Sequence, residues 1–328
     1  MRELNRLSQN GFKILCLVIF LFGGLQLIAQ NADEFCNCPD GFLTRVPTQA
    51  IKNGQIIASD LFRFSRIPAH PPVVNRCFVI DKPLVFNEPW ERYLVNCHFT
   101  MKPGSSIVIL PSSGGFHLRE GSIGGCGQSW NGIITQNGSQ LELEKSEVYD
   151  AITAVNIADG SDVRLKGTKF NDCSFGVQIE QDANITGTPI YGCTFDNCTV
   201  GVGNNGNIFV GSDLELNKFM NCANGIISKD GNLFLNNSVF ENCHVAVSTS
   251  NNESIEITNT QFINCNGGVS DINSNINIKE NIFKNIKLEA IDLKGHLTRS
   301  IEITNNKVNA WNGTVSYTHL TLPTICSV

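Results

Sequence analysis

The nine residues KFNDCSFGV at positions 169–177 return in modified form every 21 to 25 residues through the second half of this 328-residue chain. The other clear copies are TFDNCTVGV from Thr194, KFMNCANGI from Lys218, VFENCHVAV from Val239 and QFINCNGGV from Gln261. Each copy has a cysteine three residues after a phenylalanine and an apolar residue seven after it. Weaker copies are centred on Val148, Phe283 and Val308. A period in the twenties indicates stacked repeats, in which no unit buries its apolar face alone.

Apolar residues two apart precede most copies, at seven and five residues before the central position. These pairs are Leu141 and Leu143, Val163 and Leu165, Leu233 and Leu235, Ile255 and Ile257, Ile276 and Ile278, and Ile301 and Ile303. Alternation with a period of two is typical of a strand with one buried face. Each unit therefore supplies three short strands. This predicts an all-β fold, a right-handed parallel β-helix that forms a solenoid of about 8–9 coils over residues 97–314.

The handedness is expected from the general rule for parallel connections. The sequence alone leaves the left-handed hexapeptide type open, although coil lengths of 21 to 25 residues argue against a strict hexapeptide repeat. A helical repeat is excluded because residues 140–310 do not sustain apolar residues at spacings of three and four. A leucine-rich repeat is excluded because its leucine and asparagine signature is missing.

Stacked coils place equivalent residues in columns about 4.8 Å apart. The phenylalanines are expected to point inward and stack. An asparagine ladder is expected two residues after the central position, at Asn197, Asn221, Asn242, Asn264 and Asn285. Asparagine tolerates left-handed backbone and bonds neighbouring amides in turns. Asp150 and Asp172 hold the same position in earlier coils, where they are either turn residues or a carboxylate pair.

The chain has 13 cysteines, six of which are expected in one column: Cys126, Cys173, Cys198, Cys222, Cys243 and Cys265. Side chains in a column point in parallel rather than toward each other, which is poor geometry for a disulfide. Buried thiols that act as small apolar fillers are therefore the preferred interpretation, and inter-coil disulfides are the alternative. A disulfide is expected instead among Cys36, Cys38, Cys77 and Cys97.

The two ends of the chain differ from its middle. Residues 1–30 have basic residues, an apolar run from Ile14 to Ile28 and small residues before a polar stretch. This layout predicts a cleaved signal peptide, with an N-terminal membrane anchor as the alternative. Residues 31–96 are proline-rich and are expected to form a lead-in and cap, since an exposed sheet end recruits other chains. Residues 315–324 match a translated sequencing adapter, so 315–328 is expected to be a non-native tail on a truncated protein.

The composition limits the possible partners. The formal net charge is −6, only 16% of residues are charged, and no basic stripe occurs. This argues against nucleic acid and against an anionic membrane surface. A signal peptide implies that the mature chain is secreted or lies on the outer cell surface, without a stable membrane span after cleavage. The oligomeric state is not predicted.

The segments Pro-Gly-Ser-Ser-Ile-Val-Ile (103–109), Cys126 to Ile133 and Val148 to Val155 resemble those of secreted right-handed parallel β-helix proteins of Bacteroidota, which share the pectin lyase-like fold. Members of that group often end in a type IX secretion sorting domain. Such a domain would lie beyond the truncation expected here. The resemblance rests on residues that form the fold, so it implies an architecture rather than an activity.

A catalytic set is not evident in the sequence. The outward residues between the apolar pairs are Glu142, Arg164, Phe234, Glu256, Asn277 and Glu302. Glu142 with Arg164 and Glu144 with Lys166 are expected to form cross-strand ion pairs. The weak candidates for an acid and base pair are Asp213, Glu215 and Glu256, at a separation near the wide limit for inverting carboxylates. No metal spacing, phosphate loop or cofactor motif occurs, and no cofactor is expected.

Two functions remain after this reading. The preferred one is a non-catalytic extracellular β-helix that serves as a stalk, an adhesin or a module contacting an extracellular polysaccharide or cell-surface glycan. On this interpretation, the mature chain shows no hydrolytic or eliminative activity on acidic glycans. The alternative is a polysaccharide lyase or glycoside hydrolase that acts on an extracellular glycan.

Overall fold

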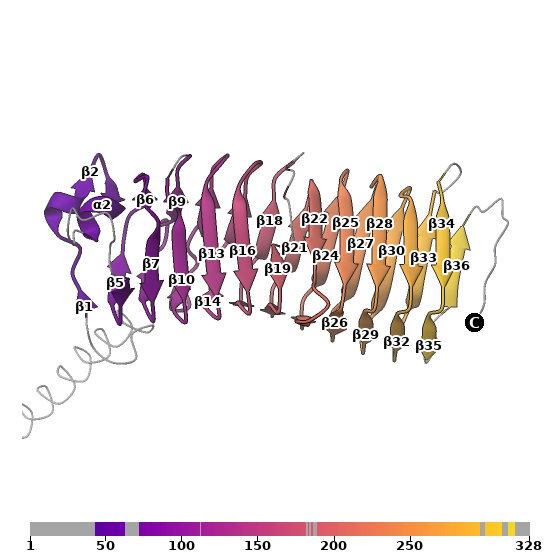
Figure 1. The fold of residues 1–328 in the computed structure, drawn as a ribbon. Coiled ribbons are helices and arrows are strands. Elements are labelled where there is room, and N and C mark those ends of the chain that lie inside the picture. The colour runs from indigo at the N-terminus through magenta and orange to yellow at the C-terminus, as the bar shows by residue number, and fades with distance from the viewer. Residues whose placement is uncertain are drawn as a thin grey trace, which may run out of the picture.

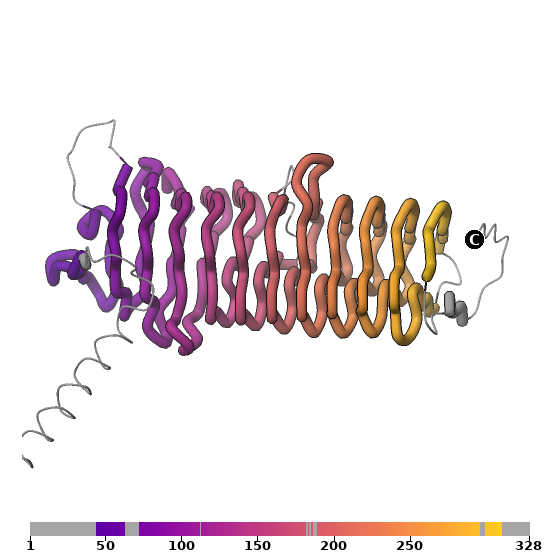
Figure 2. Tube along the Cα trace, turned by 90° about the horizontal axis from the view of Figure 1, so that it is seen from below, coloured from indigo at the N-terminus to yellow at the C-terminus, as the bar shows by residue number. Residues whose placement is uncertain are grey.

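The protein is a parallel β-helix with three sheets along its length (Figures 1 and 2). The computed structural model describes residues 43–62, 72–111, 113–181, 183, 185, 189–295, 299–309 and 314–318. The expected signal peptide and residues 319–328 of the expected tail lie outside these ranges. Each coil contributes one strand to each sheet, as the three-strand repeat predicts.

The strands of sheet A carry the central phenylalanines of the repeat. They are β1 (Leu43–Thr44), β5 (Cys77–Ile80), β8 (His98–Met101), β11 (Ser122–Gly124), β14 (Glu147–Tyr149), β17 (Lys169–Asn171), β20 (Thr194–Asp196), β23 (Asn217–Met220), β26 (Ser238–Glu241), β29 (Gln261–Ile263), β32 (Ile282–Lys284) and β35 (Lys307–Asn309). All pair in parallel, with phenylalanine beside phenylalanine from Phe170 to Phe283.

Sheet B carries the strands that begin near the Gly-Val step of the repeat. They are β2 (Ile51–Lys52), β3 (Gln55–Ile57), β6 (Leu84–Phe86), β9 (Ile107–Ile109), β12 (Ile133–Thr135), β15 (Thr153–Ile157), β18 (Phe175–Ile179), β21 (Val200–Asn204), β24 (Asn224–Lys229), β27 (Val245–Ser250), β30 (Gly267–Ile272), β33 (Glu289–Lys294) and β36 (Thr314–Thr318). The last strand includes the first residues of the expected tail and pairs with β33.

Sheet C carries the apolar pairs. Its strands are β4 (Val73–Val74), β7 (Arg92–Val95), β10 (Phe116–Arg119), β13 (Gln140–Glu144), β16 (Asp162–Lys166), β19 (Ile190–Tyr191), β22 (Asn207–Val210), β25 (Asn232–Asn236), β28 (Ser254–Thr258), β31 (Ile276–Lys279) and β34 (Ile301–Thr304). The predicted pairs from Leu141 and Leu143 to Ile276 and Ile278 are buried, and the pair Ile301 and Ile303 is half-buried.

The coils begin earlier than residue 97. Phe78 on β5 pairs with Phe99 on β8, and Leu94 on β7 pairs with Leu118 on β10, within the segment that was expected to be a lead-in. The described part of the chain therefore places 11 to 13 strands in each sheet, more than the 8–9 coils expected. The early coils were missed because they carry prolines and lack the Phe-x-Asn-Cys phrase.

A small cap closes the N-terminal end of the helix. It consists of the 3-10 turn η1 (Thr48–Ala50), the antiparallel pair β2 and β3, and the short helix α2 (Ala58–Leu61), seen at the indigo end of Figure 1. Phe62 follows α2 and is buried, with its ring centroid 5.3 Å from that of Phe78. The cap thus covers apolar side chains that would otherwise be exposed at the first coil.

The phenylalanine column forms the centre of the core. Phe170, Phe195, Phe219, Phe240, Phe262 and Phe283 are all 0% exposed. Successive rings are stacked with centroids 4.5 to 5.3 Å apart and planes within 11° of parallel. The expectation that these residues point inward and stack is confirmed.

The glycine of the repeat makes room for the ring of the next coil. At Gly225, a Cβ atom would lie 2.5 Å from Cδ1 of Phe240, closer than atoms can approach. Ala246 replaces this glycine in the next coil. There the Phe240 and Phe262 centroids are 5.3 Å apart, compared with 4.5 Å for Phe219 and Phe240. The Phe and Gly positions of the repeat are therefore linked by close packing.

The asparagine ladder is confirmed. Asn197, Asn221, Asn242, Asn264 and Asn285 have φ values from 52° to 56°, in the left-handed region that asparagine tolerates. Two of the side chains bond a neighbour in the column, from Asn285 Nδ2 to Asn264 Oδ1 at 3.0 Å and from Asn197 Nδ2 to Asp172 Oδ1. Asn221 Nδ2 instead donates to Asp196 Oδ1 at 2.8 Å. Asp150 and Asp172 have φ values of 56° and 54°, so they are turn residues of the same ladder.

A second polar column, inside the corner between sheets C and A, was not predicted. Its buried members include Ser146, Thr168, Cys193, Asn217, Ser238, Thr260 and Asn281. Several bond a carbonyl of the preceding coil, such as Thr168 Oγ1 to Leu143 O at 2.9 Å and Asn281 Nδ2 to Ile257 O at 2.9 Å. The residue types in this column vary, so no recurring residue revealed it in the sequence. All of them can nevertheless hydrogen-bond a backbone group of the preceding coil.

Five of the six expected column cysteines are free and buried: Cys173, Cys198, Cys222, Cys243 and Cys265. Each sulfur bonds a carbonyl of the preceding coil, as from Cys243 Sγ to Phe219 O at 3.5 Å. The expectation was wrong for Cys126, which is disulfide-bonded. In the next coil Ala151 holds the position of the column cysteine, three residues after Val148. Extra residues follow Cys126, so that Trp130, rather than Cys126, pairs with Ala151.

The disulfide expected among the N-terminal cysteines is only partly supported. Cys77 is disulfide-bonded, but Cys97 is free and buried. Burial raises the pKa of Cys97 to about 11. Cys36 and Cys38 lie outside the described residues. No helix in the described ranges has the length and apolar character needed to span a membrane.

We predict that Phe240→Ala lowers the free energy of unfolding by about 3 to 5 kcal/mol, because it leaves a cavity between two stacked rings. Denaturant unfolding followed by circular dichroism measures this change. Val239→Ala on the outer face of the same strand is the control, since Val239 is only half-buried. A cost for Phe240→Ala no greater than that of the control would contradict the packing described here.

We predict that the five column thiols do not react with a thiol reagent in the native protein, because buried thiols are inert. After unfolding without reductant, all five should react, as identified by peptide mass spectrometry. Oxidised column cysteines in the unfolded chain would show instead that the column is a covalent staple.

Candidate functional site

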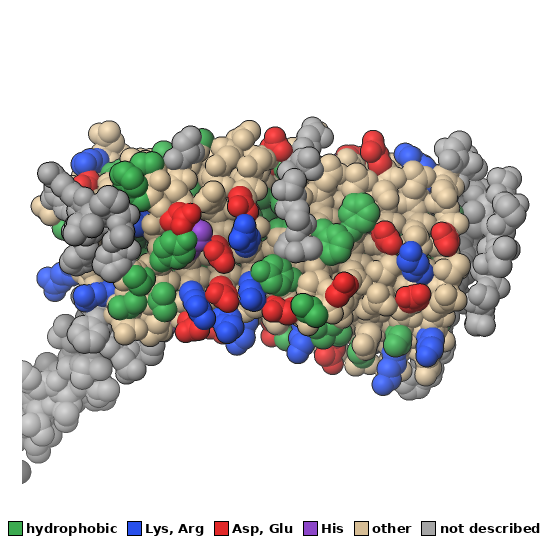
Figure 3. Space-filling view, viewed as in Figure 1, with side chains coloured by type: hydrophobic (Ala, Val, Ile, Leu, Met, Phe, Trp, Pro, Cys, Tyr) green, Lys and Arg blue, Asp and Glu red, His purple; other side chains and the backbone are tan. Residues whose placement is uncertain are grey.

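The outer face of sheet C carries exposed aromatic residues, among them Tyr93 on β7 and Phe234 on β25. Figure 3 shows this face, on which apolar side chains stand in separate patches among carboxylate and basic groups. On β22 and β25 the buried residues alternate with outward ones, which places Phe209 directly beside Phe234. The two ring centroids are 6.3 Å apart with planes 15° from parallel, and Phe234 is 36% exposed.

These two rings form one wall of a groove that we call the Phe209/Phe234 groove. It has a volume of about 250 Å³ and is lined by Phe209, Phe234, Leu235, Asn236, Glu256, Thr258, Asn259, Lys279 and Glu280. Glu256 follows Phe234 in the outward row, and its Oε1 lies 3.3 Å from Nζ of Lys279. The groove therefore has an apolar wall and a polar rim.

The rim is held by hydrogen bonds between coils. Asn236 Nδ2 donates to Asp213 Oδ1 at 2.9 Å, and Asn236 Oδ1 accepts from Thr258 Oγ1 and Asn259 Nδ2, both at 3.1 Å. These bonds fix the amide, which is an advantage for recognising a ligand. Because the partners come from different coils, stacking itself positions the rim.

A second groove lies on the same face, nearer the N-terminal end. It has a volume of about 230 Å³, and its lining includes Tyr93, His117, Glu142 and Arg164. The rings of Tyr93 and His117 are stacked at 4.7 Å, and His117 Nδ1 lies 3.0 Å from Glu142 Oε2. A hydrogen bond to Glu91 raises the pKa of Tyr93, so the phenol remains protonated at neutral pH.

The three weak acid and base candidates lie near one another in the fold but do not line one groove. Glu256 alone belongs to the Phe209/Phe234 groove. Asp213 and Glu215 lie in the loop between β22 and β23, which stands out from the coils in Figure 2. The Asp213 carboxylate bonds Asn236. The Glu215 carboxylate lies against Gly192, where an added Cβ atom would be 2.5 Å from its Oε2.

The predicted cross-strand ion pairs are half right. Lys166 Nζ lies 3.7 Å from Glu144 Oε1, as expected. Glu142 and Arg164 are neighbours in the ladder, but Glu142 bonds His117 and Arg164 bonds Asp162. Within the described residues, no group of three or more histidine, cysteine, aspartate or glutamate side chains is arranged to hold a metal ion.

Phe209 and the Tyr93/His117 stack were missed by sequence reasoning. The loop at 211–216 lengthens the sequence between the buried pair Ile208 and Val210 and the central Phe219 beyond the usual spacing of the repeat. The pair was therefore not recognised, nor was the outward Phe209 between its members. The signal was the matching alternation of Ile-Phe-Val at 208–210 and Leu-Phe-Leu at 233–235. Tyr93 and His117 were missed because the first belongs to a segment assigned to the cap.

Comparison with known proteins supports the fold. No curated protein and no solved structure gives a significant match. A family model described as "Right handed beta helix region" matches residues 91–214. This range includes the N-terminal groove and ends within the loop at 211–216. The expected right-handed parallel β-helix is therefore confirmed, and over residues 91–214 the chain is similar to that family.

Proposed function

We propose that the protein binds a neutral polysaccharide along the outer face of sheet C and does not cleave its glycosidic bonds. The observation that carries this proposal is the pair of stacked, outward phenylalanines at 209 and 234 beside a fixed polar rim. A row of exposed aromatic rings presents flat apolar surface. The C–H face of a sugar ring packs on such a surface, while its hydroxyl groups bond the rim.

The geometry of a solenoid suits a repeating ligand. Equivalent outward positions recur with each coil, about 4.8 Å apart. The Tyr93/His117 stack lies on the same sheet as the Phe209/Phe234 pair, several coils away. A chain of sugar units can therefore contact aromatic rings at both places. Multiple weak contacts of this kind add through effective concentration.

The charge of the face favours a neutral ligand. Glu256 is paired with Lys279, and Glu280 adds a further carboxylate to the same groove. The chain as a whole has a net charge of −6. An acidic polysaccharide would be repelled by this charge distribution, especially at low salt.

The pairing of the carboxylates around this groove does not favour glycosidic cleavage. An inverting or retaining mechanism requires two carboxylic groups that converge on one bond. Glu256 and Glu280 both line the groove, but Glu256 is paired with Lys279. Asp213 and Glu215 contact Asn236 and Gly192 outside it. Binding at an extracellular location, as a surface stalk or adhesin, is the role that we propose.

Binding is tested by affinity electrophoresis in gels that contain xylan, mannan or β-glucan. We predict that at least one neutral polysaccharide retards the protein and that alginate and pectin do not. The double variant Phe209→Ala/Phe234→Ala should bind about 10-fold more weakly, a loss of about 1.4 kcal/mol. The variant Glu256→Gln should keep the apolar wall and most of the affinity.

The matched control is Ile272→Ala/Leu288→Ala, which removes two side chains that are 51% and 56% exposed outside the groove. This control should bind as the unmodified protein does. Equal binding by the double phenylalanine variant would show that the groove is not the site. Release of reducing sugars that Glu256→Gln abolishes would favour a glycoside hydrolase instead.

A further inference from the structure

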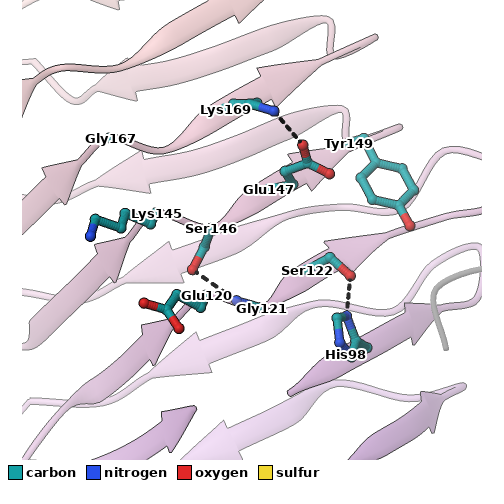
Figure 4. A pocket seen from close by; sticks show the side chains of 10 residues that line it. All are labelled: His98, Glu120, Gly121, Ser122, Lys145, Ser146, Glu147, Tyr149, Gly167 and Lys169. Carbon is teal, nitrogen blue, oxygen red and sulfur yellow. Dashed lines mark hydrogen bonds and ion pairs between the residues drawn. The ribbon is translucent and has the colours of Figure 1, made fainter. Parts of the chain in front are cut away.

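A separate depression lies on sheet A, where it meets the corner from sheet C. It has a volume of about 520 Å³, and its lining residues are drawn in Figure 4. His98 on β8, Ser122 on β11, Glu147 on β14 and Lys169 on β17 form one outward row across four coils. None of these residues belongs to the face proposed to bind a polysaccharide.

A serine and a histidine are hydrogen-bonded within this depression. The distance from His98 Nδ1 to Ser122 Oγ is 2.8 Å, and Figure 4 shows the two side chains facing each other. The other ring nitrogen, Nε2, lies 3.2 Å from Asn96 Oδ1. Both ring nitrogens of His98 are therefore engaged, one by a hydroxyl and one by an amide.

The hydrogen bonds of Asn96 define the tautomer of His98. Asn96 Nδ2 donates to Asn75 Oδ1 at 2.8 Å, which turns Asn96 Oδ1 toward the histidine. An amide oxygen only accepts hydrogen bonds, so His98 Nε2 must carry the proton. Nδ1 is then the acceptor, and the hydroxyl of Ser122 donates to it. This is the arrangement of a nucleophile, a general base and an orienting group.

The surroundings keep the histidine able to accept a proton. Burial lowers the pKa of His98 below its ordinary value, so the ring is neutral at pH 7. A base must be unprotonated before it can take the proton of a serine hydroxyl. Ser122 is half-buried and lines the depression, so a small substrate bound there would lie against it.

Tyr149 lies beside Ser122 and supplies a further donor. Its ring lies across Gly124, where an added Cβ atom would be 2.2 Å from Tyr149 Cε2. Burial raises the pKa of Tyr149 to about 12, so the phenol keeps its proton. A phenol in this position can donate to the oxyanion that forms when a carbonyl is attacked.

We propose that Ser122 and His98, oriented by Asn96, hydrolyse carboxylic esters of short acyl groups, such as acetyl esters of sugar hydroxyls. The lining includes Lys145, Glu147 and Lys169, and the depression is open to solvent rather than a closed tunnel for a long acyl chain. This activity goes beyond the proposed binding of a polysaccharide and uses a different sheet.

The reaction balances without another cofactor. Ser122 Oγ attacks the carbonyl carbon, and its proton moves to His98 Nδ1. The bond from carbon to the alcohol oxygen breaks, and the alcohol leaves with that proton. Water then attacks the acyl–serine, gives a proton to His98, and the carboxylic acid leaves as Ser122 regains its proton. Ester and water are consumed, and acid and alcohol are formed.

Two measurements on the purified chain test the proposal. A fluorophosphonate probe should label Ser122, as identified by peptide mass spectrometry. Hydrolysis of p-nitrophenyl acetate should fall at least about 100-fold in Ser122→Ala and in His98→Gln, the range expected for loss of a nucleophile or base. Thr194→Ala is the control, because Thr194 continues the same outward row without a histidine partner, and it should leave hydrolysis unchanged.

Asn96 is tested as a positioning residue. Its φ value is 50°, so Asn96→Gly removes the amide without straining the backbone. We expect kcat to fall about 10-fold in Asn96→Gly and to be restored in Asn96→Asp, which keeps an acceptor for His98 Nε2. A purely structural role would not give this rescue.

Three results would overturn the proposal. They are labelling of no residue, labelling of a residue other than Ser122, and hydrolysis that Ser122→Ala leaves intact while the variant keeps its circular dichroism spectrum. The probe and the ester contain no sugar, so failure here is distinguishable from failure of the proposed polysaccharide binding.

Discussion

The fold depends on a backbone hydrogen bond between successive coils. At each corner where an asparagine has a positive φ, its backbone N–H donates to a carbonyl of the next coil. At every corner the chain must turn sharply without losing its place in the stack. The backbone N–H of Asn221 donates to Glu241 O at 3.0 Å, and that of Asn242 donates to Ile263 O at 3.1 Å. A backbone amide that is buried without a hydrogen-bond partner lowers the free energy of unfolding. Each of these bonds therefore helps to hold its corner in the stack. Asparagine tolerates the required φ value, and the side chain of Asn285 also bonds that of Asn264 in the ladder.

Regular stacking has consequences for the core. Once the corners fix the register, equivalent residues lie one above another in columns. Leucine, isoleucine and valine fill the buried columns of sheet C, while the phenylalanine column requires parallel flat rings and a small residue, glycine or alanine, beside them. The close approach of Gly225 to the Phe240 ring shows how tightly the two requirements are linked. The same stacking brings Ser122 to His98 and Phe209 to Phe234 from positions about one coil apart in the sequence.

The sequence was a good guide where residues repeat and a poor one where they do not. The Phe column, the Asn ladder and the thiols from Cys173 to Cys265 follow from recurring letters, and all were predicted. The early coils, which contain Phe78 and Leu94, were missed because they carry prolines and lack the Phe-x-Asn-Cys phrase. Phe209 and the pairing of His98 with Ser122 were missed for a different reason. They depend on which residues lie side by side in adjacent coils, and one inserted loop changes that register.

Hydrogen exchange at the corner amides is the most direct test of this account. Asn197, Asn221, Asn242, Asn264 and Asn285 have exposed side chains, yet each amide is bonded to the next coil. Native-state exchange measured by NMR should be slow at these five amides, close to the rates of the central strands. The amide of Leu214 provides the comparison, because this residue lies in the loop at 211–216 and is 93% exposed. Corner amides that exchange as fast as that of Leu214 would contradict the account.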